Sequence, residues 1–167
     1  MTHRECPEYI SRLRELFSYC PDTGIISRLL QRGPCRQGSE AGTPALGYGT
    51  TYRKIKIDGT MYRAHRVAWA LHYGVWPVGL IDHINKDGAD NRIANLRLAT
   101  HSQNAANSGP RSGRALPRGV VFDARSDRYY SYGTKNYKKT YLGCFKNQKS
   151  AEAAYAAWSR ENNGEFA

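Results

Sequence analysis

Four polar residues in one short stretch of the chain have the types and the order needed to cut a phosphodiester bond. They are Asp82, His83, Asn95 and Asn104. An imidazole such as that of His83 can take a proton from water near neutral pH. The carboxylate and amide oxygens of Asp82 and Asn104 are hard ligands that suit a Mg²⁺-like ion which keeps most of its waters. Such an ion can hold a phosphate and stabilise the leaving oxygen, so one base and one ion suffice for hydrolysis.

Two short strands joined by a polar loop are predicted to carry the first of these residues. Residues 79–81 form a brief apolar segment after a Trp-Pro pair, as at the start of a strand. Residues 85–92 are dense in Asn, Asp and Gly, which is typical of a loop. Residues 96–99 alternate between apolar and polar or small side chains, as in a second short strand.

A helix is predicted directly after the second strand. Thr100 and Gln103 have the spacing of a capping box, so the helix should begin there with Asn104 in its first turn. A strand, loop, strand and helix that fold back on one another would bring Asp82, His83 and Asn104 face to face.

This ordered set resembles the HNH endonuclease motif, in the branch that ends in asparagine and is common among phage and homing endonucleases. The resemblance rests on Asp82-His83, Asp90-Asn91-Arg92, Asn95-Leu96-Arg97 and Asn104, and it extends upstream through His65-Arg66 and Trp69 over roughly residues 19–107. It implies that His83 is the general base, that Asp82 and Asn104 bind one divalent ion, and that Asn95 restrains the loop. Many members have histidine where this chain has Asn104, so Mg²⁺ or Mn²⁺ is favoured over Zn²⁺.

Further elements are predicted upstream from local patterns. They are an amphipathic helix at 9–19, a strand at 25–28, a mobile loop at 31–46, a hairpin formed by 52–57 and 61–64, and a helix at 65–73 closed by Gly74.

The predicted hairpin is basic, with tyrosines interleaved among its cations. It either contacts phosphates or forms a solvated outer face. His65, which opens the following helix and has an equivalent histidine in related nucleases, either lies near the scissile phosphate or makes a structural hydrogen bond. The candidate DNA contacts of this half are Arg53, Lys54, Lys56, Arg63 and His65.

The C-terminal part predicts three short strands and a helix. The strands fall at 118–122, 128–132 and 139–145, and the helix follows the N-cap Asn147 and continues to about residue 162. Alternation along the second strand would place Arg128, Tyr130 and Tyr132 on one face of the sheet and Tyr129 and Ser131 on the other.

This part resembles the ethylene-response-factor (APETALA-type) DNA-binding domain, which phage HNH nucleases often carry at their C-terminal end. The resemblance rests on Arg118-Gly119-Val120, Leu142-Gly143-Cys144-Phe145 and Ser150 to Tyr155, with departures at Tyr129 and Gly133. In that family the sheet lies in the major groove, whose width suits a β-ribbon. Alternatively, the aromatic residues of this small sheet form its core, and the arginines in its turns are simply exposed to solvent. The candidate DNA contacts are Arg118, Arg125, Arg128, Tyr130, Tyr132 and Lys138.

Composition agrees with a polyanionic partner. The formal net charge is +11 over 167 residues, and Lys and Arg exceed Asp and Glu in both halves of the chain. A basic surface fits nucleic acid, with affinity that falls as salt rises. Charge alone would equally fit a membrane surface or mere solubility.

The cysteines and the chain start favour a reduced intracellular protein. Cys6, Cys20, Cys35 and Cys144 form no C-x-x-C pair, which argues against a zinc ribbon and a disulfide framework. We expect no signal peptide and no membrane span, and a cytoplasmic setting, with a phage-infected bacterial host as the source.

The sequence thus predicts an α+β fold in three parts. Residues 1–107 would form a ββα-metal HNH module preceded by helices and a basic hairpin, 108–115 a basic flexible linker, and 116–167 a three-stranded antiparallel sheet packed on one helix. The predicted activity is hydrolysis of double-stranded DNA with one divalent cation and no other small-molecule cofactor, by a nicking monomer or by a dimer, with homing as a possible role. The alternatives are a non-catalytic, sequence-specific DNA-binding protein on a degenerate HNH scaffold, or an RNA-binding protein.

Overall fold

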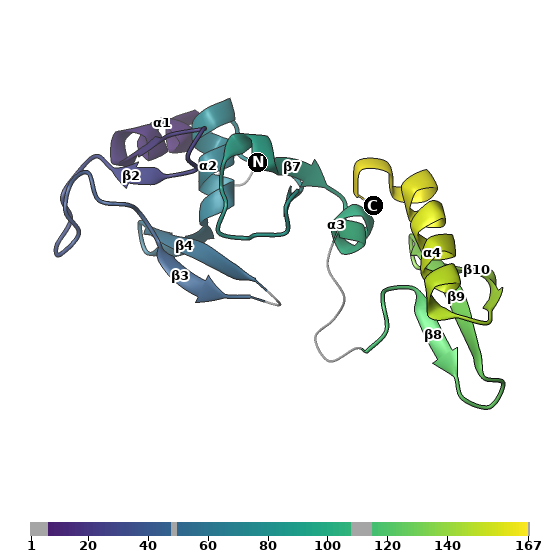
Figure 1. Cartoon of the computed structure of the whole chain (residues 1–167). Helices are drawn as coiled ribbons and strands as arrows, with labels where there is room; N and C mark the ends of the chain where they lie inside the picture. Colours follow the sequence, from purple (N-terminus) through teal and green to yellow (C-terminus); the bar gives the residue numbers. More distant parts are fainter. Residues whose placement is uncertain (1–6, 48–49, 108–114, 167) are drawn as a thin grey trace. The chain divides into compact units, whose positions relative to one another are not determined.

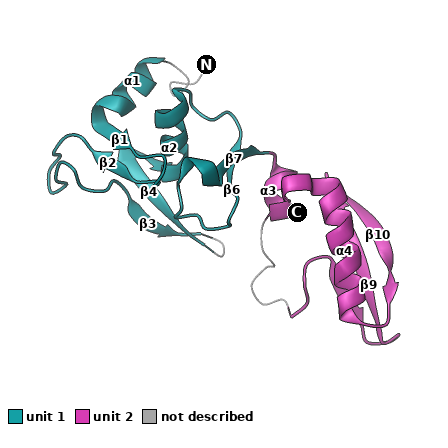
Figure 2. Ribbon diagram, turned by 45° about the horizontal axis from the view of Figure 1, so that its top comes forward, with its two compact units in different colours: residues 1–99 teal, residues 100–167 magenta. Residues whose placement is uncertain are grey.

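The chain has a mixed α+β fold, as the sequence predicts. The computed structural model describes residues 7–47, 50–107 and 115–166 (Figure 1). They divide into two compact units, Met1–Ala99 and Thr100–Ala167 (Figure 2). Most of the predicted linker at 108–115 lies outside the described residues, so the predicted domain boundaries stay a prediction.

Unit 1 begins with helix α1 (Pro7–Leu16) and a small hairpin. Strand β1 (Phe17–Tyr19) pairs antiparallel with β2 (Ile26–Arg28), so the predicted helix at 9–19 was too long. The helix ends early because the turn at residues 20–24 returns the chain along Phe17–Tyr19 and gives these residues a strand partner. Phe17 and Ile26 are both buried as a result.

A three-stranded antiparallel sheet follows, in the order β3-β4-β5. It consists of β3 (Thr43–Leu46), β4 (Thr51–Ile57) and β5 (Thr60–Arg63). The predicted hairpin is confirmed, with Asp58 and Gly59 at φ 45° and 85° in its tight turn. The prediction of a loop throughout 31–46 was wrong at its end, because Thr43–Leu46 pair with the second edge of β4.

Helix α2 (Ala64–Tyr73) is confirmed, and it supplies much of the core of unit 1. Gly74 ends it in the left-handed region at φ 71°, and its N–H donates to the Ala70 carbonyl at 3.0 Å. Val67 of α2 packs with Leu13 of α1 and with Ile55 and Ile57 of β4 in one buried cluster.

Two short strands complete unit 1. Strand β6 (Leu80–His83) pairs antiparallel with β7 (Leu96–Ala99), and the 3₁₀ turn η1 (Ile93–Asn95) immediately precedes β7. The predicted strands and the loop between them are confirmed.

Helix α3 (His101–Asn107) opens unit 2 with the predicted capping box. The Gln103 N–H donates to Thr100 Oγ1 at 3.2 Å, and the Thr100 N–H donates to Gln103 Oε1 at 2.8 Å. Because β6 and β7 belong to unit 1 and α3 to unit 2, the ββα-metal arrangement stays a prediction.

The rest of unit 2 is an antiparallel sheet covered on one face by a helix. Strands β8 (Val120–Asp123), β9 (Arg128–Lys135) and β10 (Lys138–Phe145) lie in the order β10-β9-β8. Helix α4 (Gln148–Asn163) lies along this sheet (Figure 1) and is followed by the 3₁₀ turn η2 (Gly164–Phe166). The predicted N-cap is confirmed, since Asn147 Oδ1 accepts from the Ser150 N–H at 2.9 Å.

Small residues on β9 let α4 approach the sheet closely. Ser131 is fully buried, and a Cβ on Gly133 would lie 2.3 Å from the Trp158 ring. Glycine at position 133 therefore makes room for the Trp158 indole, which accounts for this departure from the resembled pattern.

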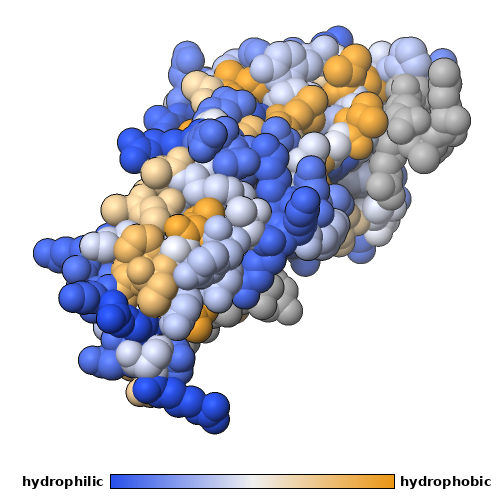
Figure 3. Space-filling view, turned by 90° about the vertical axis from the view of Figure 1, so that its right-hand side faces the viewer, coloured by the Kyte–Doolittle hydropathy of each residue, from blue (hydrophilic) through white to orange (hydrophobic). Residues whose placement is uncertain are grey.

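Hydrophilic residues cover most of the face that Figure 3 shows, with smaller apolar patches between them. In the part of the chain that the structure describes, no helix combines the length and the apolar character that a bilayer crossing requires.

Gly133→Ala should destabilise unit 2, because the added methyl group would overlap the Trp158 ring. Overpacking of this kind costs about 1–3 kcal/mol. Calorimetric melting of the full chain should show a lower transition temperature. The matched control is Gly79→Ala, whose Cβ would meet only the Ala99 carbonyl at 3.6 Å. Equal melting of the two variants would contradict the proposed packing.

Candidate active site

Strand β6 carries two of the predicted site residues at its end. Asp82 and His83 are both buried, at 5% and 6% exposure, and they pair across the strands with Arg97 and Leu96. Successive strand residues point to opposite faces, so Asp82 meets Arg97 while His83 meets Asn91, and the predicted convergence of Asp82, His83 and Asn104 stays a prediction.

Asn95 lies at the base of the loop that joins β6 to β7. Its Oδ1 accepts from the Asn85 N–H at 2.9 Å, and its Nδ2 donates to the Asp90 carbonyl at 2.8 Å. The Asn95 carbonyl also accepts from the Ile84 N–H at 2.9 Å. One residue therefore ties the two ends of the loop to its middle.

Asp90 forms a second restraint inside this loop. Its carboxylate accepts a fork of two bonds from Arg92, at 2.8 and 2.6 Å, and a third from Asn85 Nδ2 at 2.7 Å. The Arg92 guanidinium is the main reason that the pKa of Asp90 falls to about 2. The carboxylate stays ionised at neutral pH and keeps the loop closed.

His83 faces the buried side chain of Asn91 rather than that of Asn95. Its Nε2 lies 3.5 Å from Asn91 Oδ1, while Asn91 Nδ2 donates to the Ala89 carbonyl at 3.2 Å. An amide oriented in this way would accept from a protonated Nε2 and so favours the neutral tautomer whose lone pair lies on Nδ1. Burial lowers the pKa of His83, which keeps the ring neutral at neutral pH.

A second histidine packs beside the first. The rings of His65 and His83 have centroids 5.0 Å apart, and the ring of Tyr52 lies 6.0 Å from each. Burial, and then the neighbouring His83, lower the pKa of His65 to about 3. His65, predicted as a DNA contact, is only 8% exposed and meets the Tyr52 ring edge to face.

The loop is held from the N-terminal side by the turn between β1 and β2. The Tyr19 hydroxyl donates to the Asn91 carbonyl at 2.7 Å, and the Ile93 N–H donates to the Pro21 carbonyl at 3.1 Å. Gly24, at φ 75°, lies so close to the loop that a Cβ would be 2.5 Å from the backbone nitrogen of Arg92. Only glycine tolerates both the conformation and the contact.

The loop is held from the other side by the start of β4. The Gly88 N–H donates to Thr50 Oγ1 at 2.9 Å, and the Tyr52 ring covers Gly88 so closely that a Cβ would lie 2.6 Å from it. The Arg63 guanidinium lies over the ring of Tyr52, with its Cζ 4.3 Å from the ring centroid.

Sequence reasoning missed several of these supports. They are Tyr19, Gly24, Thr50, Tyr52 and the side-chain contact of Asn91 with His83. The one local signal that pointed to them was glycine: Gly24 and Gly88 each stand where another segment passes closely.

The predicted metal ligand Asp82 forms a buried ion pair. Its Oδ2 accepts from Arg97 Nε at 2.9 Å and lies 2.9 Å from Arg97 Nη2. The predicted second ligand, Asn104, lies in α3 of unit 2, so its convergence with Asp82 stays a prediction. Among the described residues, no group of three or more His, Cys, Asp or Glu side chains is placed to hold an ion.

The basic residues of the hairpin have different environments. Arg53 is tied down, since Nη2 donates to the Gly42 carbonyl at 3.1 Å and Nε lies 3.1 Å from Glu40 Oε1. Lys56 is exposed and Lys54 partly buried. Lys54 and Lys56 are therefore better placed than Arg53 to reach a phosphate.

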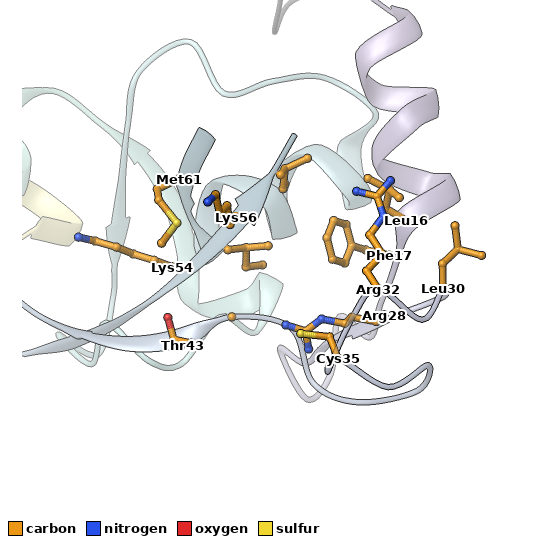
Figure 4. A pocket seen from close by; sticks show the side chains of 13 residues that line it. Leu16, Phe17, Arg28, Leu30, Arg32, Cys35, Thr43, Lys54, Lys56 and Met61 are labelled. Carbon is orange, nitrogen blue, oxygen red and sulfur yellow. The ribbon is translucent and has the colours of Figure 1, made fainter. Parts of the chain in front are cut away.

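Lys54 and Lys56 also line a cavity of about 380 Å³ in unit 1 (Figure 4). Its apolar floor is formed by the end of α1 and by Ile55 and Ile57 of β4, and Cys35 lies at its wall. His65, Asp82 and His83 are not among the residues that line it, so this cavity is separate from the candidate base.

The predicted contacts of unit 2 also divide into two kinds. Arg118 Nη1 donates to the carbonyls of Ala105 and Ala106 at the end of α3, the latter at 2.9 Å, which gives it a structural role. Arg125 is exposed in the turn between β8 and β9, and Lys138 is exposed as the first residue of β10. Arg128, Tyr130 and Tyr132 alternate with buried Ser131, which places them on the sheet face away from α4.

Comparison with known proteins supports the nuclease interpretation of the loop and its flanking strands. Residues 62–106 match the family model of the HNH endonucleases. The match supports an HNH nuclease domain in this chain. HNH nucleases act on DNA and generally use a divalent metal ion. Neither the curated proteins nor the solved structures gave a match. The resemblance of residues 116–162 to the ethylene-response-factor (APETALA-type) DNA-binding domain therefore stays a prediction.

Acid should destabilise unit 1 through His65. Its pKa is about 3 in the folded protein but about 6.5 in an unfolded chain. Between these values the unfolded chain binds a proton that the folded protein excludes, so stability falls as pH drops below about 6.5 and is unaffected above it.

The urea midpoint of the full chain, measured between neutral pH and about pH 4.5, reports this loss. His65→Gln should show a smaller loss than the natural protein, although buried His83 contributes in the same direction. His101→Gln is the control, because His101 is exposed. A pH dependence in His65→Gln as steep as that of the control would refute the assignment.

Proposed function

We propose that this chain is a metal-dependent endonuclease that hydrolyses phosphodiester bonds of duplex DNA, with His83 as the general base. The observation that carries the proposal is the environment of His83. The ring is buried, its pKa is lowered, and its Nε2 faces Asn91 Oδ1. A neutral imidazole with one nitrogen held by an acceptor can take a proton from water at the other nitrogen.

The neighbours of His83 would keep it in this state. Asn95 closes the loop through Asn85 and Asp90, so that Asn91 stays beside the imidazole. His65, buried against His83 with a pKa of about 3, brings no positive charge at neutral pH. In this proposal Asn95 is a positioning residue, and the proton is taken by the imidazole of His83.

The donor atoms of the predicted ligand pair fit a hard divalent ion. Asp82 offers carboxylate oxygen and Asn104 amide oxygen, which favours Mg²⁺ or Mn²⁺ over Zn²⁺. When bound, the ion would supply Lewis-acid stabilisation of the phosphate and of the departing 3′ oxygen. Arg97 would balance the charge of Asp82 and orient its carboxylate.

Basic residues in both units would hold the DNA. Lys54, Lys56 and Arg63 would make phosphate contacts in unit 1, and the face of β8–β10 away from α4 would make contacts in a groove. With one base in each chain, a monomer would nick one strand, and cutting of both strands would need two chains or two events. Site-specific cutting of the homing type would depend on the sheet of unit 2.

One observation favours a second candidate function. The Asp82 carboxylate is already compensated by Arg97, with two nitrogens 2.9 Å from one oxygen. A carboxylate so engaged is a weaker cation ligand. If it does not hold an ion, the chain would be a non-catalytic DNA-binding protein on an HNH scaffold.

His83→Ala should abolish nicking of supercoiled plasmid in Mg²⁺ while leaving duplex affinity nearly unchanged. Loss of a general base typically costs about 10²–10⁴-fold in rate. His101→Ala, at an exposed position, should cut at the natural rate. Cutting by His83→Ala at the natural rate would rule out His83 as the base. A natural protein that shifts duplex DNA but never nicks it would support the non-catalytic alternative.

Asn91→Asp should move the pH dependence of nicking upward. In the natural protein, burial lowers the pKa of His83, so the rising part of the rate profile should lie below about pH 6.5. A carboxylate in place of the Asn91 amide would stabilise the imidazolium and raise that pKa, so more alkaline pH would be needed for the neutral base.

Asn91→Leu provides the matched comparison, since it removes the acceptor without adding charge. Its rate should fall because the tautomer is no longer fixed, without the upward shift in pH. Profiles of the single-turnover rate that coincide for all three proteins would show that Asn91 does not act on His83.

A further inference from the structure

The hairpin of β9 and β10 ends in a tight turn with an unusual residue at its tip. Lys135 pairs with Lys138, so Asn136 and Tyr137 alone form the loop. Both have positive φ, at 49° and 64°, as a type I′ turn requires. The second position of such a turn strongly favours glycine, and a bulky aromatic residue is disfavoured there.

The Tyr137 side chain gains nothing from the fold in return. It is 97% exposed, more than any other large hydrophobic residue in the described part of the chain. Its backbone therefore bears the cost of a left-handed conformation while its ring contributes no burial. Strained, fully exposed positions of this kind are typical of functional sites.

The base of the turn, in contrast, is firmly anchored within unit 2. The Asn136 N–H donates to Ser102 Oγ of α3 at 3.3 Å, and Lys135 Nζ donates to the Asn162 carbonyl at the end of α4. The turn is fixed in place while Tyr137 projects from it, so little freedom would be lost when the ring meets a partner.

The charge of the hairpin indicates which partner this is. Arg128–Phe145 contains four basic residues and no acidic one, together with five tyrosines. Lys138 adjoins Tyr137, and Lys139 Nζ lies 3.8 Å from the centroid of the Tyr132 ring. Cations interleaved with exposed aromatic rings suit a nucleic acid, whose phosphates attract the cations and whose bases and sugars offer apolar surface.

We propose that the tip of the β9–β10 hairpin is a DNA contact in which the Tyr137 ring packs directly against the nucleic acid, with Lys138 on a neighbouring phosphate. The inference rests on the proposed function, because it assigns duplex DNA to this chain. The inference adds Tyr137 to the DNA contacts. Because the contact of its ring is apolar, its contribution to affinity should not depend on salt.

Replacing Tyr137 should change stability and affinity in opposite directions. Tyr137→Gly removes the ring and also relieves the positive φ, so melting of unit 2 should rise by about 4 °C. Its dissociation constant for a labelled mixed-sequence duplex, measured by anisotropy without divalent ions, should rise at least about fivefold. Tyr137→Ala should lose the same affinity without the gain in stability, and Tyr137→Phe should bind like the natural protein.

Two controls separate the ring from the turn and from the charge. Asn136→Gly changes the other left-handed position but keeps the ring, so its affinity should be unchanged. Lys138→Gln should weaken binding and also reduce the dependence of affinity on salt by about one ion, whereas the Tyr137 variants should keep the natural salt dependence.

The outcomes distinguish this inference from the proposed function. If the natural protein binds the duplex and Tyr137→Gly and Tyr137→Ala bind equally well, Tyr137 does not contact DNA and the inference is overturned. If the natural protein does not bind the duplex at all, the proposed DNA function fails, and the inference fails with it.

Discussion

The candidate site depends on the hydrogen bonds that the side-chain amide of Asn95 makes within its loop. This amide accepts from the start of the loop at Asn85 and donates to its middle at Asp90, while the Asn95 carbonyl binds Ile84. A loop rich in Asn, Asp and Gly has many conformations of similar energy, and these bonds select one of them. In that conformation β6 and β7 pair, and Asn91 comes to lie beside His83.

Burying so many polar groups requires a partner for each of them. Tyr19 and Pro21 meet the far side of the loop, and Thr50 meets Gly88. The β1–β2 hairpin and the start of β4 thus act on the loop from separate parts of the sequence. Removal of either support would leave buried donors or acceptors without partners, which is more costly than the loss of a solvated hydrogen bond.

Electrostatics at the site follow from the same burial. Withdrawal from water lowers the pKa of both His65 and His83, so the two rings can pack together without repulsion. Arg63 lies nearby on the face of Tyr52, and Arg97 compensates Asp82. Two neutral imidazoles with a guanidinium nearby would suit the phosphate backbone of DNA that the proposed function requires. In unit 2 the two faces of the sheet differ in composition. The face that packs on α4 carries small residues, and the opposite face carries basic and aromatic residues.

The sequence by itself determined the features that depend on neighbouring residues. Asp58-Gly59 specifies the β4–β5 turn, Thr100 and Gln103 specify the start of α3, and Asn147 specifies the start of α4. Each rests on hydrogen bonds or backbone preferences within a few positions, which a sequence pattern displays directly. The composition and alternation of residues 79–81, 85–92 and 96–99 were likewise sufficient to predict a strand, a loop and a strand.

Only the tertiary structure decided the features that depend on distant segments. Phe17–Tyr19 became a strand because Ile26–Arg28 lies beside it, and His83 contacts Asn91 because Asn95 sets the path of the loop. Trp158 of α4, distant from Gly133 in the sequence but packed against it, explains the glycine at that position of β9. The alternation of residues in a strand shows which side chains share a face, but it does not show what covers that face. The covering group comes from chain folding over long separations, where packing and burial outweigh local preference.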